Sequence, residues 1–121
     1  MIKANFNFKQ NTFISLNITG HAEHKKNNDE YDIVCAGVSS IVFGILNKLA
    51  KENFEGNIIV EENLIIVENK ESIKDNTIDI IIDTLIVQLK TIEESYSKHL
   101  SVKIQKNKNW KVTNKGETNV L

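Results

Sequence analysis

The order in which apolar spacing changes along this chain limits its fold more than any other feature. In residues 2–8, and again in residues 14–18, apolar and polar side chains alternate with the period of a β-strand. The dipeptide Gln10–Asn11 interrupts this alternation and Gly20 ends it, which is typical of a turn and of a strand end. The chain is therefore predicted to begin with a β-hairpin.

The pattern then changes to that of a helix and back again. Between residues 32 and 51 the apolar side chains recur three and four positions apart, which predicts an amphipathic helix. The β-branched runs at 58–60 and 64–67 predict a second hairpin, followed by a helix over 72–97 and a strand over 100–104. This strand-strand-helix-strand-strand-helix-strand order favours a two-layer α+β fold, with two helices packed on one face of a β-sheet.

A chain of 121 residues fits one domain. The periodic segments all lie within residues 1–106, which we predict to form that domain. Residues 107–121 are mostly polar and are interpreted as a C-terminal tail.

Charge and composition disfavour several classes of partner. The formal net charge is −1, and all 15 basic residues are lysines. Because arginine leads bidentate recognition of phosphates and base edges, we expect no direct contact with nucleic acid. The apolar run at residues 80–82 is far too short to span a bilayer, so no membrane partner is predicted.

The chain contains one cysteine, so the fold does not depend on an internal disulfide. Its first residues lack the continuous apolar core of a signal peptide, and we expect a cytoplasmic protein. The sequence has no paired C-x-x-C or H-E-x-x-H spacing, no phosphate-binding glycine loop and no dinucleotide fingerprint. No metal and no cofactor are therefore predicted.

Cys35 is the first candidate for chemistry. A lone cysteine on an apolar helix is more often a buried structural residue than a reactive one. However, if Asp32 is the N-cap, Cys35 is the third helical residue, where the helix dipole favours a thiolate. The backbone N–H groups of Cys35 and Ala36 would then be candidates for an oxyanion hole.

His21 is the candidate base, because it follows the second strand at the entrance to the loop that returns to Cys35. It could instead be a strand-end histidine without a catalytic role. Gly20 and Ala22 are small and leave room beside its imidazole. The segment from Ala22 to Tyr31 has no apolar period and is interpreted as a mobile loop that could close over a substrate. His24 and His99 are weaker candidates.

Asp32 has two alternative roles. The simpler one is the N-cap, worth about 1 kcal/mol, and we favour it. The other is to orient His21 as a third catalytic residue. Both roles draw on the same carboxylate oxygens, so one competes with the other.

Two motifs together resemble the ribosomal-processing cysteine protease family, Prp. They are Thr19-Gly20-His21-Ala22 and Asp32-Ile33-Val34-Cys35-Ala36-Gly37-Val38-Ser39. The resemblance implies a homodimeric bacterial α+β enzyme that removes the N-terminal extension of a large-subunit ribosomal protein. It also implies that Cys35 is the nucleophile, His21 the general base and Asp32 the acid of the motif. Ser39, one turn beyond Cys35, is a candidate pocket residue. The loop from Ala22 to Tyr31 is somewhat longer and poorer in glycine than the family pattern.

The leading hypothesis is therefore a cysteine protease whose partner is a ribosomal-protein precursor peptide. The alternative is a non-enzymatic ribosome- or RNA-associated α+β binding module, by analogy of fold alone. A third hypothesis is a redox-sensing thiol at Cys35.

Overall fold

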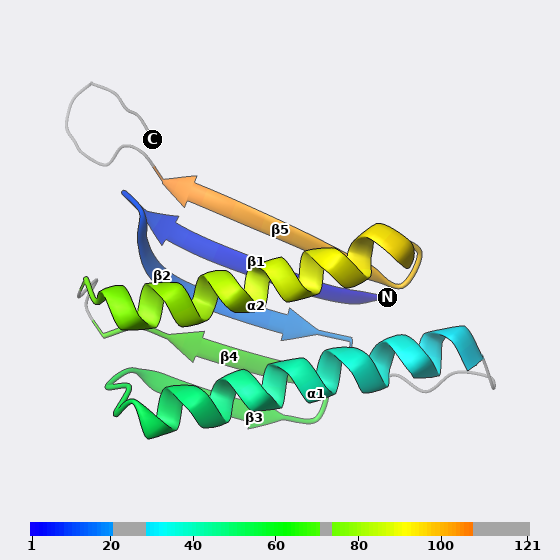
Figure 1. Ribbon diagram of the computed structural model, residues 1–121, viewed down its shortest axis with the longest axis horizontal. Coiled ribbons are helices and arrows are strands. Elements are labelled where there is room, and N and C mark those ends of the chain that lie inside the picture. Colours follow the sequence, from blue (N-terminus) through cyan, green and yellow to red (C-terminus); the bar gives the residue numbers. More distant parts are fainter. Residues whose placement is uncertain (21–28, 71–73, 108–121) are drawn as a thin grey trace.

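Two helices cover one face of a five-stranded sheet in the computed structural model, which describes residues 1–20, 29–70 and 74–107 (Figure 1). Along the chain the elements are β1 (Ile2–Lys9), β2 (Thr12–Thr19), α1 (Asp29–Lys51), β3 (Asn57–Glu61), β4 (Leu64–Glu68), α2 (Asn76–Ser95) and β5 (Leu100–Asn107). The strands lie in the order β3-β4-β2-β1-β5. The predicted α+β class, element order and two-layer arrangement are confirmed.

β1 is the strand that connects the first hairpin to β5. It pairs antiparallel with β2 and parallel with β5. Gln10 and Asn11 both have positive φ values, 51° and 66°, as a tight hairpin turn requires. β5 continues beyond the predicted residue 104, because it pairs with β1 as far as the Lys9–Asn107 position.

The hydrophobic core lies between the helices and the sheet. Ile2, Ala4 and Phe6 of β1 are fully buried. The predicted apolar stripe of the first helix is confirmed, and its buried residues are Tyr31, Val34, Cys35, Val38, Val42, Leu46 and Leu49. The buried residues of α2 are Ile78, Ile81, Ile82, Leu85, Ile86 and Leu89.

Both helices differ from their predicted bounds. α1 starts at Asp29 rather than after Asp32, because Tyr31 is buried and extends the apolar stripe by one turn towards the N-terminus. α2 starts at Asn76 rather than near residue 72. Asp75 is its N-cap, with an extended backbone and a carboxylate that accepts from the N–H groups of Thr77 and Ile78 at 2.9 and 3.3 Å. α2 also ends at Ser95, two residues before its predicted end.

Among the described residues, α1 is the one helix that is long and apolar enough to cross a membrane by length and composition. The expectation of no membrane partner rested on the short apolar run at residues 80–82, whereas α1 is the longer apolar segment. A core helix of a soluble protein passes the same test. Seven residues of α1 belong to the hydrophobic core, which accounts for its apolar composition.

One end of the molecule gathers segments that are far apart in the sequence. The start of α1, the start of β1, the end of β2 and the connection from α2 to β5 all lie at the right-hand end of Figure 1. Cys35 belongs to this end of α1.

Candidate active site

Cys35 is an almost buried residue on the inner face of α1. Its exposed fraction is 7%, and it belongs to the same core cluster as Tyr31, Val34 and Val38. The prediction that it is the third helical residue is wrong, because α1 already starts at Asp29. The helix dipole acts mainly within the first turn, so Cys35 lies beyond the positions where its effect is largest.

Asp32 is an exposed residue inside the first turn of α1. The prediction that it is the N-cap is wrong, because an N-cap residue precedes the helix and has a non-helical backbone. Its carboxylate still complements the positive end of the helix, as do those of Asp29 and Glu30. The capping role no longer competes for its oxygens, and the orienting role stays a prediction.

The predicted oxyanion hole at the helix start is also wrong. A helix leaves only its first four N–H groups without an intrahelical acceptor. Cys35 and Ala36 lie beyond these four in α1, so their N–H groups are committed to the helix. The side chain of Ala36 is exposed.

Ser39 lies one turn after Cys35 on α1 and is half-buried. Residues three and four apart are neighbours on a helix surface, so Asp32, Cys35 and Ser39 follow one line along α1. This line runs from exposed through buried to half-buried side chains. The geometry is compatible with the predicted role of Ser39 beside the thiol.

Gly20 directly follows β2 in a conformation that suits glycine, with φ of +84°. Its backbone N–H donates to the carbonyl oxygen of Asn63 at 3.4 Å. Its own carbonyl oxygen accepts a hydrogen bond of 2.6 Å from the phenol of Tyr31. The end of β2 is therefore attached to α1 one turn before Cys35.

Tyr31 was predicted to be a loop residue, and this prediction is wrong. It is a helical residue that is 6% exposed. The helix includes Tyr31 because its ring packs into the core as part of the apolar stripe. Its hydroxyl remains hydrogen-bonded, to the carbonyl oxygen of Gly20. His21, Ala22 and residues 23–28 of the predicted mobile loop lie outside the described residues.

His99 is a neighbour of this site that the sequence reasoning set aside. Its ring centroid lies 5.6 Å from that of Tyr31, and its Nε2 lies 3.5 Å from a carboxylate oxygen of Glu30. The carbonyl oxygen of His99 accepts from the N–H of Ile2 at 2.9 Å. No local sequence pattern predicts these contacts, because they join residues that are far apart in the sequence.

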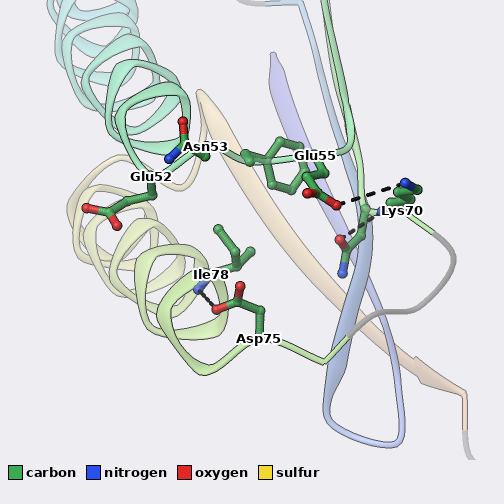
Figure 2. A pocket seen from close by; sticks show the side chains of 8 residues that line it. Glu52, Asn53, Glu55, Lys70, Asp75 and Ile78 are labelled. Carbon is green, nitrogen blue, oxygen red and sulfur yellow. Dashed lines mark hydrogen bonds and ion pairs between the residues drawn. The ribbon is translucent and has the colours of Figure 1, made fainter.

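A cavity of about 190 Å³ lies at the other end of α1. Figure 2 shows the side chains that line it. Its lining includes Glu52, Asn53 and Asp75, and an ion pair of 3.9 Å joins Glu55 to Lys70 beside it. A helix rises 1.5 Å per residue, so this cavity is separated from Cys35 by roughly 25 Å along α1. It is not part of the Cys35 site. No group of three or more possible metal ligands occurs among the described residues.

Comparison with known proteins identifies the family. The Peptidase_Prp family model, described as cysteine protease Prp, matches residues 1–101. The chain belongs to the Prp cysteine protease family. The family predicted from the two sequence motifs is thus confirmed.

Relatives with known names are similar to most of the chain. The ribosomal processing cysteine protease Prp of Bacillus subtilis is 33% identical over 95 residues, which are 74% of this chain and 83% of that protein. The protein of the same name from Staphylococcus aureus is 32% identical over 84 residues, 67% of this chain and 76% of the relative.

A solved Prp structure has the same fold. The crystal structure of the essential ribosomal processing protease Prp from S. aureus, in complex with a substrate peptide, matches with a TM-score of 0.76. Sequence identity in this match is 23%, and it covers 87% of this chain and 100% of that chain. This Prp chain is thus a cysteine protease, as predicted, rather than a non-enzymatic binding module.

Proposed function

We propose that this Prp chain is a cysteine endopeptidase that removes the N-terminal extension of a large-subunit ribosomal protein during ribosome maturation. One observation carries the choice of nucleophile. The family hydrolyses peptide bonds with a cysteine, and Cys35 is the single cysteine of the chain. Both relatives are named ribosomal processing cysteine proteases, which supports the choice of substrate.

The proposed chemistry uses Cys35 and His21 as a pair. The thiolate of Cys35 attacks the scissile carbonyl carbon and forms a thioester as the C–N bond breaks. His21, which holds the proton from the thiol, gives it to the leaving amine. A water molecule then hydrolyses the thioester, transfers a proton back through His21 and releases the new carboxyl terminus.

Other residues support this pair in the proposal. Asp32 orients His21, now that the helix start lies upstream of Asp32. Ser39 lines the pocket beside the thiol. The oxyanion is stabilised by donors other than the N–H groups of Cys35 and Ala36, which are committed to α1. The reaction needs no metal or cofactor.

The proposed setting is a bacterial cytoplasm, where the enzyme acts as a homodimer on the precursor peptide without binding nucleic acid directly. The catalytic domain comprises residues 1–106. Residues 107–121 are proposed as a polar tail, although Asn107 is the last residue of β5 and 108–121 lie outside the described residues.

Cleavage of the organism's own ribosomal-protein precursor tests the proposal. Cys35→Ala should abolish cleavage, whereas Ser40→Ala, an exposed change on the same helix, should leave it unchanged. Mass spectrometry of the product locates the cut. Wild-type cleavage by Cys35→Ala would refute the proposed nucleophile. Salt-dependent RNA binding that survives Cys35→Ala would instead support the alternative of an RNA-associated binding module.

A further inference from the structure

Tyr31 connects the two segments that carry the proposed catalytic pair. Its phenol donates a hydrogen bond of 2.6 Å to the carbonyl oxygen of Gly20, eleven residues earlier in the chain. Gly20 is the residue directly before His21, and Tyr31 lies one helical turn before Cys35. The contact is therefore a direct tie between the end of β2 and the part of α1 that holds the thiol.

The ring of Tyr31 also packs against the ring of His99. The His99 ring lies 5.6 Å away between centroids, and the His99 side chain is 15% exposed. The backbone of His99 is held in turn, because its carbonyl oxygen accepts from Ile2 and its N–H donates to Tyr96, both at 2.9 Å. A phenol held in this way has little freedom to move away from Gly20.

Gly20 itself is confined from further directions. Its N–H is bonded to Asn63, and the backbone of Met1 leaves no room for a β-carbon on it. The Tyr31 hydroxyl adds the connection to α1. Because this bond is made to a backbone carbonyl rather than to a side chain, it holds the main chain of Gly20 against α1.

The geometry points to Tyr31 as a positioning residue of the protease. Its hydroxyl holds the Gly20 carbonyl against α1 and thereby sets how the chain enters His21 relative to Cys35. This inference rests on the proposed Cys35–His21 pair. A misplacement of about 1 Å in a catalytic group can reduce a rate by about 100-fold. Loss of this one hydrogen bond is therefore expected to slow the reaction.

Tyr31→Phe is the test, because it removes the hydroxyl and retains the ring that packs on His99. We expect kcat for the precursor peptide to fall at least about tenfold while KM stays within about twofold of wild type. Alkylation of Cys35 by iodoacetamide at neutral pH should slow in parallel. The matched control is Tyr96→Phe, which removes a hydroxyl from a half-buried tyrosine at the same end of the molecule.

Two further readouts separate positioning from folding. Thermal unfolding of Tyr31→Phe should stay close to that of Tyr96→Phe, so that the loss of kcat is not a loss of folded enzyme. The Gly20 amide should exchange with deuterium faster in Tyr31→Phe, whereas the amide of Leu16 in mid-strand β2 should not change. This exchange measurement tests the effect of the Tyr31–Gly20 hydrogen bond on the backbone without any cleavage assay.

The outcomes distinguish this inference from the proposed function. If Cys35→Ala is inactive but Tyr31→Phe keeps the kcat of Tyr96→Phe, the positioning role is wrong and the nucleophile stands. If kcat falls only in proportion to the unfolded fraction, Tyr31 has a structural role alone and the inference is overturned. If Cys35→Ala cleaves like wild type, the proposed function fails, and the positioning role fails with it.

Discussion

A β-carbon on Gly20 would overlap the backbone carbonyl oxygen of Met1. Gly20 also has a φ of +84°, in the left-handed region that side chains with a β-carbon avoid. The end of β2 and the first residue of the chain are thus so close that the backbone there accepts only glycine. Since the next residue is His21, this restriction bears on the proposed base as well as on stability.

Gly20→Ala should lower the free energy of unfolding by at least about 1 kcal/mol, from the left-handed backbone alone. Cleavage should fall too, because the end of β2 must shift away from Met1. The matched control is Gly44→Ala on α1, where a β-carbon meets nothing within 4 Å. That change should raise stability by about 0.5–1 kcal/mol. Urea unfolding of the two variants should give opposite signs, and equal stability of Gly20→Ala and wild type would contradict the structure.

Glu93 satisfies a backbone group of the edge strand β5. Its carboxylate accepts a hydrogen bond of 3.1 Å from the N–H of Val102 in a partly buried position. Glu93→Ala removes this acceptor and should lower the free energy of unfolding by about 1–3 kcal/mol. Glu94→Ala, at the exposed neighbouring position, should change it by less than about 0.5 kcal/mol. Thermal and urea unfolding measure both, and a neutral Glu93→Ala would remove the assigned role.

Asp75 is the N-cap of α2 (Figure 2), and α2 starts at the end of the molecule away from the start of α1 (Figure 1). Asp75→Ala should lower the free energy of unfolding by about 1 kcal/mol, since two N–H groups lose their acceptor. Asp83→Ala, inside the same helix, provides the control without loss of a cap. Cleavage by the folded enzyme should be the same for both variants. A selective loss of kcat in Asp75→Ala would mean that this end of the molecule contributes to the reaction.

The local signals were sufficient for the strands and for the inward face of each helix. The alternation in residues 2–8 places Ile2, Ala4 and Phe6 on one face, and all three are buried. Gln10 and Asn11 occupy the predicted turn. Period and turn chemistry act over a few residues, so they can be detected without knowing the partner strands.

The helix starts were harder to predict because a residue with the chemistry of an N-cap does not by itself mark where a helix begins. Asp32 has the chemistry of an N-cap, but burial of Tyr31 favours a helix that begins earlier. At Asp75 the carboxylate is the cap, and the predicted start near residue 72 was too early. Propensity alone does not decide between such alternatives, since tertiary packing overrides it.

The candidate site was predictable as a set of residues but not as an arrangement. The motifs contain Cys35 and His21, and the first of these lies on the predicted helix. The contacts of Tyr31 with Gly20 and His99 depend on packing at the shared end of the sheet and helices. Such contacts have no local period, and only the assembled fold brings their members together.

Asp32 offers a sharp test, because the structure removes one of its two predicted roles. It is exposed in the first turn of α1 and is not the N-cap, so Asp32→Asn should change the free energy of unfolding by less than about 1 kcal/mol. If its carboxylate orients His21, kcat for the precursor should fall by a factor on the order of 100 or more, as expected when a histidine loses its orienting acid. Asp29→Asn, in the same turn, is the matched control for charge and should retain wild-type kcat. Equal kcat values for the two variants would leave Asp32 with no catalytic role beyond its favourable place at the helix start.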